Sequence, residues 1–282
     1  MSALGLSITP RRAATILRYT VAASFGLALI FPLAYLLSLS LMSATDAVAS
    51  PPHLVPPSFH WGNFAQAFDF LSVRTVVNSF VFTLGVLVLQ LSLALPAGFA
   101  MAQIPFRGAT ALAAVFVVPM FLPNNISVIP LFVVTLKLHL VDSYAGLILP
   151  IVGSTAFGTL LFRQFFTNLP SGLVEAARID GAGWFRILRS IAVPLARPAI
   201  AAYSVITFLT AWNMYVWPQI VATSKELKVV PVALAPLARS TYNIIPPSVG
   251  AAAAVLSALP VIVVFLFGQR WFVYGMSGTG LE

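Results

Sequence analysis

The sequence predicts an all-α, polytopic integral membrane protein with six transmembrane helices. Of its 282 residues, 60% are hydrophobic and only 8% are charged, and the mean hydropathy is +0.98. A soluble domain keeps about a quarter of its residues charged, so lipid must be the solvent over most of this surface. Apolar runs of roughly 20 residues, long enough to cross a bilayer as a helix, occur at residues 19–41, 75–102, 110–133, 144–162, 199–217 and 249–268.

The first apolar run resembles a secretory signal, because Arg11, Arg12 and Arg18 precede it and the sequence AVAS at residues 47–50 resembles a cleavage site. A signal-peptide core, however, has only about 7–15 apolar residues, and this run is longer. We therefore expect a retained first helix, with cleavage as the alternative.

The basic residues predict the orientation. An even number of spans puts both termini on one side. If that side is the cytoplasm, ten of the fifteen Lys and Arg residues lie in the inner segments 1–18, 103–109, 163–197 and 270–282, and five in outer segments of equal total length. Because Lys and Arg favour cytoplasmic loops, we expect a membrane protein with both termini in the cytoplasm. The net charge of +8 then indicates membrane lipid, not nucleic acid, as the partner surface.

The predicted spans contain no ionisable side chain, and all seven acidic residues fall in loops or tails. An ionisable group within the bilayer is the usual mark of a proton relay. An ion-coupled secondary transporter of a small polar solute is therefore the weaker alternative, although sodium coupling through backbone carbonyls stays open.

The sequence predicts no catalytic residue and no metal ligand. It has no cysteine, its three histidines are isolated, and H-E-x-x-H and G-x-S-x-G are absent. His53 and His60 share a proline-rich loop and are a weak alternative metal site. Since no glycine is followed by lysine, a G-x-x-x-x-G-K-[ST] phosphate loop cannot form, and any ATP must be bound by another chain.

A charged segment, LPSGLVEAARIDGAGWFRILRSIAVPLARP at residues 169–198, interrupts this apolar sequence. Pro170 and Ser171 predict the start of a helix. Gly181 and Gly183, which adopt positive φ at little cost, predict a sharp turn after it.

A second, amphipathic helix is predicted after this turn. Its apolar residues have helical spacing and form one side of the helix; they are Trp184, Ile187, Leu188 and Ile191. Arg186 and Arg189 lie on the other side. Pro194 is expected to close this helix, and Pro198 to lie in the first turn of the next span. Two interpretations stay open, a rigid docking surface for a protein partner and an amphipathic loop held by anionic lipid.

The segment resembles the signature of permease subunits of ABC importers, which reads E-A-A, three residues, G, nine residues, I-x-L-P. The residues in register are Glu175, Ala176, Ala177, Gly181, Ile191 and Pro194, and Val193 stands where leucine is usual. Four stretches also resemble the carbohydrate-uptake branch, most closely the six-span permease of maltose and glycerol-3-phosphate importers: residues 161–182, 180–200, 211–235 and 269–280. The resemblance covers roughly residues 74–280.

The resemblance implies an ABC-importer permease fold and the function of translocating a carbohydrate or related polyol compound. It implies a core at residues 74–270 with a coupling loop at 163–197, preceded by residues 1–73 (cytoplasmic segment, first helix and outer loop) and followed by a cytoplasmic tail at 271–282. The residues implied to couple to the ATPase are Glu175, Ala176, Ala177, Asp180, Gly181, Arg186 and Pro194.

The implied partners are a second permease, different from this chain, two ATPase subunits and an extracellular solute-binding protein. ATP and Mg would be bound by the ATPase, and this chain would carry no cofactor. The tail after Arg270 is also implied to reach toward the ATPase, although its ending GLE departs from the family pattern.

Polar residues within apolar spans are candidates for the solute pathway. These are Asn124 and Asn125, after a proline in the third span, and Trp212, Asn213 and Tyr215 in the fifth. Aromatic faces beside amides suit a neutral, hydroxyl-rich solute. The alternatives are aromatic anchoring at the membrane interface and hydrogen bonds between helices, the role expected for Asn78 and Gln90. The resemblance also allows the companion permease to make most of the solute contacts.

Overall fold

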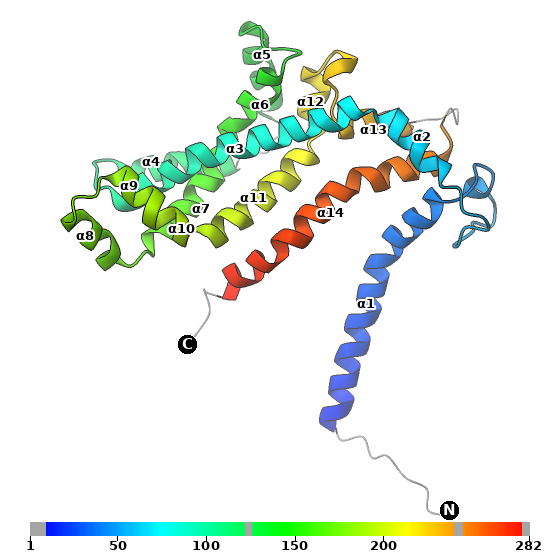
Figure 1. Cartoon of the computed structure of the whole chain (residues 1–282), viewed down its shortest axis with the longest axis horizontal. Helices are drawn as coiled ribbons and strands as arrows, with labels where there is room; N and C mark the ends of the chain where they lie inside the picture. The colour runs from blue at the N-terminus through cyan, green and yellow to red at the C-terminus, as the bar shows by residue number, and fades with distance from the viewer. Residues whose placement is uncertain (1–9, 122–125, 240–244, 278–282) are drawn as a thin grey trace, which may run out of the picture. The chain divides into compact units, whose positions relative to one another are not determined.

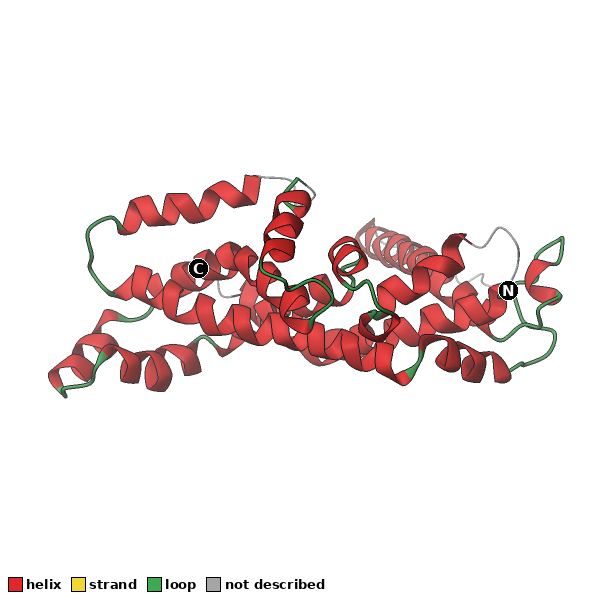
Figure 2. Cartoon of the chain, turned by 90° about the horizontal axis from the view of Figure 1, so that it is seen from above, coloured by secondary structure: helices red, strands yellow, loops and turns green. Residues whose placement is uncertain are grey.

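The computed structural model describes residues 10–121, 126–239 and 245–277. Within these ranges every regular element is a helix, as Figure 2 shows. The chain divides into two compact units, one made of Met1–Phe70 with Leu237–Leu256 and the other of Leu71–Pro236 with Ser257–Glu282.

The first unit contains the first predicted span. Helix α1 (Pro10–Ser40) is followed by a 3-10 turn, η1 (Asp46–Val48), and by α2 (Gly62–Leu71). No residue of the most apolar stretch of α1 is buried within the chain, which suits a helix surrounded by lipid. The Asn63 amide holds the end of α1 against the start of α2 by donating to Ser40 O (2.9 Å) and Met42 O (2.8 Å).

The second unit is built along α3 (Val73–Gln103), beside which Figure 1 shows α7 (Ala156–Thr167) and α11 (Arg197–Trp212). Ser72 begins α3 by accepting a hydrogen bond from the Thr75 backbone amide at 3.2 Å, which satisfies a free N–H of the first turn. The remaining elements outside the charged segment are α4 (Ala109–Val117), η2 (Val118–Phe121), α5 (Val128–Lys137), α6 (Tyr144–Val152), η3 (Gly153–Thr155), α12 (Val216–Val221), η5 (Lys225–Leu227), α13 (Val230–Arg239) and α14 (Pro247–Ser277).

Four helical stretches are long and apolar enough to cross a membrane: Thr15–Ser40, Val73–Gln103, Tyr144–Thr167 and Pro247–Gln269. A fifth is the bent pair Trp184–Leu195 and Arg197–Trp212. The third predicted span, 110–133, corresponds to shorter apolar helices on either side of residues 122–125, which lie outside the described ranges. Six spans are consistent with these elements, and the number itself stays a prediction.

The predicted end of the fifth span at Trp217 is wrong. Helix α11 ends at Trp212, where the Asn213 amide turns back to donate to Leu209 O at 2.8 Å. Trp217 lies in the separate helix α12 and donates from Nε1 to Leu147 O at 3.0 Å. A local side-chain hydrogen bond of this kind competes with continuation of the helix, and hydropathy does not detect it.

Helices α3 and α7 approach closely at Gly98. A β-carbon at this position would lie 2.8 Å from Arg163 N, Phe162 Cβ and Thr159 O, two of which are backbone atoms that cannot move aside. The absence of a side chain therefore sets the distance between these two helices.

We expect Gly98→Val to lower the thermal stability of the detergent-solubilised chain, because overpacking of a tight contact costs about 1–3 kcal/mol. Gly172→Ala is the matched control, since a β-carbon added there would meet no atom within 4 Å and φ is not positive. The two melting temperatures check this expectation, and equal values would contradict it.

The N-terminal end of α3 is fixed by Asn78. Its Nδ2 donates to Glu226 O (2.8 Å) and Lys228 O (2.9 Å), and its Oδ1 accepts from the Tyr144 hydroxyl at 2.5 Å. The interpretation of Asn78 as a bridge between segments is confirmed. Because both polar atoms of this amide are hydrogen-bonded, its burial carries little energetic penalty.

Asp142 joins two loops of the same unit. Its backbone N–H donates to Val221 O and its carboxylate accepts from Ser224 N, both at 2.9 Å. Its φ of 58° lies in the left-handed region, which Asp and Asn tolerate better than most residues. The Ser224 backbone N–H, assisted by further hydrogen bonds from Ser224 and Thr223, lowers the pKa of Asp142 below 3.8.

A lowered pKa in the folded state stabilises the loop contact above the unfolded value of 3.8, and this contribution is lost as the pH falls through the folded value. We expect protease cleavage of residues 138–143 to increase as the pH falls below 3.8. Asp142→Asn keeps an acceptor and the left-handed φ, so cleavage of this variant should not change over the same range. An acid-active protease applied to both proteins makes the measurement, and identical pH profiles would contradict the expectation.

Candidate coupling segment

The charged segment forms two short helices around a tight corner. Helix α8 (Ser171–Ile179) starts directly after Pro170, as the sequence predicts. After the corner come α9 (Trp184–Ile187), a π-helical turn η4 (Leu188–Ala192) and α10 (Val193–Leu195). Figure 1 shows α8 and α9 close to the C-terminal end of α3.

Gly181 makes the corner. Its φ is +78°, and the Ala182 N–H donates to Ala177 O (2.9 Å) while the Gly181 N–H donates to Arg178 O (3.1 Å). This pair of bonds is the Schellman arrangement that ends helices at a left-handed glycine. The prediction for Gly181 is confirmed, whereas Gly183 is extended, with φ −71° and ψ 161°, so one glycine alone turns the chain.

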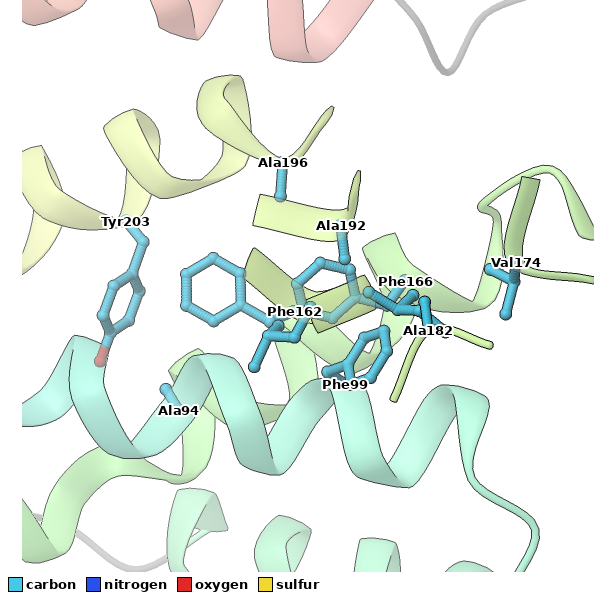
Figure 3. Packing of buried hydrophobic residues seen from close by; sticks show 11 residues of the cluster. Ala94, Phe99, Phe162, Phe166, Val174, Ala182, Ala192, Ala196 and Tyr203 are labelled. Atoms are coloured by element: carbon cyan, nitrogen blue, oxygen red, sulfur yellow. The ribbon is translucent and has the colours of Figure 1, made fainter. Parts of the chain in front are cut away.

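A cluster of buried apolar residues anchors the segment. Figure 3 shows Val174 and Ala182, on either side of the corner, beside Phe166 of α7 and Phe99 of α3. Ile187 is completely buried in the same cluster. Movement of the segment is therefore coupled by packing to α3 and α7.

Arg178 and Trp184 join the two helices across the corner. The Arg178 guanidinium carbon lies 4.6 Å from the centroid of the Trp184 ring, within the range of a cation–π contact. The Arg178 Nη1 also approaches Ala182 O at 3.4 Å. Trp184 in turn packs edge-on against Phe99, with 6.3 Å between the centroids.

Most of the predicted coupling residues lie on the free surface of this segment. The exposed ones are Glu175, Ala176, Asp180, Gly181 and Arg186, whereas Ala177 and Pro194 are half-buried. Two residues that the sequence interpretation missed lie on the same surface, Ile179 (85% exposed) and Phe185 (76% exposed). Apolar side chains this exposed are available to a partner that would bury them.

The expectation that Pro194 closes the second helix is wrong. The helix continues through it to Leu195, and the preceding π-turn accommodates the residue that has no backbone N–H. The chain then bends by 78° before Arg197–Trp212. Pro198 lies in the first turn of α11, as predicted.

Three of the five predicted solute-pathway residues, Trp212, Asn213 and Tyr215, lie in the part of the chain that the structure describes. Trp212 is buried, donates from Nε1 to Ser257 O at 3.1 Å and packs against Phe80 and Phe208. Asn213 is exposed and Tyr215 is half-buried. Asn124 and Asn125 lie outside the described residues, and the pathway role of all five stays a prediction.

The family assignment comes from a longer stretch of sequence that includes this segment. Residues 94–278 match the family described as binding-protein-dependent transport system inner membrane component. The chain belongs to this family. As such an inner membrane component it is a transport permease subunit, not an enzyme.

Relatives of this permease match over most of their length. The sn-glycerol-3-phosphate transport system permease protein of Agrobacterium fabrum is 33% identical over 88% of this chain and 91% of its own. The arabinooligosaccharides transport system permease protein of Bacillus subtilis is also 33% identical, over 80% of both chains.

Solved structures support the fold of the permease. A chain from the crystal structure of a bacterial ABC transporter that imports the acidic polysaccharide alginate superposes with a TM-score of 0.83, covering 93% of this chain and 97% of its own at 24% identity. A chain from an alginate transporter in complex with a periplasmic protein that holds an alginate pentasaccharide superposes with a TM-score of 0.64 at 17% identity. At these identities the comparison concerns the fold alone.

Proposed function

We propose that this permease is one of two membrane subunits of an ATP-driven importer for a carbohydrate or related polyol compound in a bacterial cytoplasmic membrane. Its termini face the cytoplasm, and its segment 163–197 couples it to an ATPase. The core is residues 74–270, the N-terminal helix and outer loop belong to 1–73, and 271–282 form a cytoplasmic tail.

The observation that carries this proposal is the exposed corner at Gly181 above a rigid apolar anchor. Val174, Ala182 and Ile187 fasten the corner to helices α3 and α7. Glu175, Asp180 and Arg186 are exposed around it. A partner that pushes on such a surface moves the helices below it, because a close-packed interior transmits displacement.

The proposal includes the partners. Two ATPase subunits bind ATP and Mg and each receives one coupling segment, so a second permease, different from this chain, supplies the other. An extracellular solute-binding protein delivers the solute, in keeping with the family description. The tail after Arg270 makes a further contact with the ATPase.

The solute class is supported by the relatives, whose names specify glycerol-3-phosphate and arabinooligosaccharides. Both are hydroxyl-bearing compounds. The predicted spans contain no ionisable side chain. They therefore suit a solute that is recognised through its hydroxyl groups and offer no charged residue for coupling its transport to an ion.

A pull-down tests the proposal. The chain, tagged at its N-terminus and expressed in its native membrane, is purified in mild detergent, and the proteins that accompany it are identified by mass spectrometry. We expect an ATPase and a second permease with the wild type, and less ATPase with a variant carrying a bulky residue in place of Gly181.

Purified complex should also import a labelled sugar into proteoliposomes only when ATP is supplied on the side of the coupling segment. A chain that purifies without an ATPase from detergent and from lipid nanodiscs, and transports when driven by an ion gradient, would contradict the proposal. It would favour the secondary-transporter hypothesis.

A further inference from the structure

A cavity of about 260 Å³ lies between α3, η2, η3, α7 and α11, roughly midway along α3. Its polar lining consists of Gln90, Ser154, Tyr203, Thr207 and Thr210, from three separate parts of the chain. None of these residues except Gln90 was identified from the sequence as functional or structural. Tyr203 and the two threonines lie at spacings of four and three residues on α11 and therefore on one face.

A closed hydrogen-bond network holds one wall of the cavity. Gln90 Nε2 donates to Ile151 O (3.1 Å) and Ser154 Oγ (3.0 Å), and Gln90 Oε1 accepts from the Tyr203 hydroxyl at 2.9 Å. Figure 3 shows the Tyr203 ring extending from α11 toward α3. Gln90 thus bridges three helical segments, which confirms its predicted role in hydrogen bonds between helices. These hydrogen bonds also hold its partners in position.

The helix that contributes Ser154 is broken at the cavity. Between α6 and α7 lies the 3-10 turn η3, in which Ser154 has non-helical φ −79° and ψ 22°. At membrane depth, irregular backbone is tolerated where it is buried in protein or lines a polar cavity. Broken helices near the middle of the membrane commonly form solute sites in transporters.

One exposed aromatic ring and two exposed hydroxyl groups line the cavity. Phe157 is 41% exposed, and its ring packs against the Tyr203 ring with 6.2 Å between the centroids. Ser154 and Thr210 are exposed at the same cavity, and each hydroxyl donates to its own helix. Because Ser154 Oγ also accepts from Gln90, it keeps one lone pair for a ligand, whereas Thr210 Oγ1 keeps two. An apolar ring face with hydroxyl acceptors beside it matches the C–H face and O–H rim of a sugar ring.

The lining also sets the charge of the ligand. None of the lining residues is Lys, Arg, His, Asp or Glu, so an anionic solute would lose its hydration here without a compensating charge. The volume lies below the roughly 300–1,000 Å³ of sites for drug-sized ligands, which favours one sugar unit over a whole oligosaccharide.

We propose that this cavity is a solute-contact site that binds one neutral sugar ring, stacked on Phe157 and hydrogen-bonded to Ser154 and Thr210, with Gln90 and Tyr203 as the positioning residues behind it. The inference rests on the proposed transport function and adds to it that this chain contacts the solute. It also adds that an uncharged sugar is preferred to a phosphorylated or carboxylated one.

The test uses the intact transporter in proteoliposomes. Because this chain contains no cysteine, Ser154→Cys and Thr210→Cys each introduce a single thiol on it. A wild-type uptake assay with neutral mono- and disaccharides and with sn-glycerol 3-phosphate identifies the imported compound. Labelling of each thiol by a charged methanethiosulfonate reagent is then followed on this chain by mass spectrometry.

We expect both thiols to react, and to react about tenfold more slowly when the imported neutral sugar is present at ten times its dissociation constant. Ser92→Cys, on the exposed surface of α3 outside the cavity lining, is the control, and the sugar should not change its labelling. Thr210→Val should raise the KM for uptake roughly 3- to 10-fold, the effect of losing one neutral hydrogen bond, with kcat unchanged.

Sugar uptake that proceeds without protection of either thiol would overturn the cavity assignment and leave the transport function intact. If sn-glycerol 3-phosphate is imported and protects the thiols, and no neutral sugar does either, the charge preference and with it the proposed site would be overturned. A wild-type transporter that imports none of these compounds would count against the proposed function itself.

Discussion

Replacement of Gly181 by valine is expected to reduce solute uptake to a few per cent of wild type while the chain still inserts and folds. Gly181 has φ +78°, and a β-carbon added there would meet no atom within 4 Å, so the cost is backbone strain, about 1–2 kcal/mol for a residue with a β-carbon. Relief of this strain would open the Schellman turn and rotate α8 away from α9. Uptake of labelled sugar, normalised to the amount of chain in the membrane, measures the effect.

Two further variants separate backbone conformation from side-chain bulk. Gly183→Ala is the control, because its φ of −71° suits any residue and its β-carbon would meet nothing within 4 Å; uptake should stay near wild type. Gly181→Asn keeps the left-handed conformation but adds bulk at the corner. If Asn also abolishes uptake, the partner approaches the corner closely. Normal uptake with Gly181→Val would contradict the coupling role.

The second large effect is expected at Phe185. Its ring is 76% exposed on the surface assigned to the ATPase, and burial of such a side chain contributes about 1.5–3 kcal/mol. Phe185→Ala should therefore weaken ATPase binding roughly 10- to 100-fold, with a matching loss of uptake. Titration of purified ATPase onto the chain in nanodiscs provides the affinity.

Phe185→Leu retains most of the apolar area and should bind nearly as tightly as wild type. Ile179→Ala, on the other side of the corner, should weaken binding in the same direction as Phe185→Ala. An affinity unchanged by both alanine variants would show that the ATPase does not cover this surface.

The local structure of the coupling segment is predictable from sequence because its determinants are local. Pro170 begins a helix, Gly181 ends it, and the apolar spacing from Trp184 to Ile191 identifies the buried side of the second helix. The same signals mislead at Pro194, where a π-turn accommodates the proline. They also mislead at Trp217, where the side chain of Asn213 ends α11 early.

The cavity could not be predicted in this way. The hydrogen bond between Gln90 and Tyr203 joins residues 113 positions apart, and no periodicity or composition relates two such positions. The sequence offers only a weaker signal, a glutamine and a tyrosine within otherwise apolar spans, and this signal does not indicate that the two side chains meet. The exposure of Ile179 and Phe185 is equally unpredictable from the sequence, because an apolar side chain is expected on the buried side of a helix as well as on a docking surface.

One crosslinking measurement tests the central claim most directly. A cysteine introduced as Ile179→Cys in the intact transporter, in native membranes, is treated with a short thiol–amine crosslinker, and the adduct is identified by mass spectrometry, with Ser92→Cys as the control. We predict that Ile179→Cys yields an adduct with an ATP-hydrolysing chain and that Ser92→Cys does not. A cysteine at position 179 that reacts with small reagents and supports uptake, yet never captures an ATPase, would contradict the coupling role of this surface.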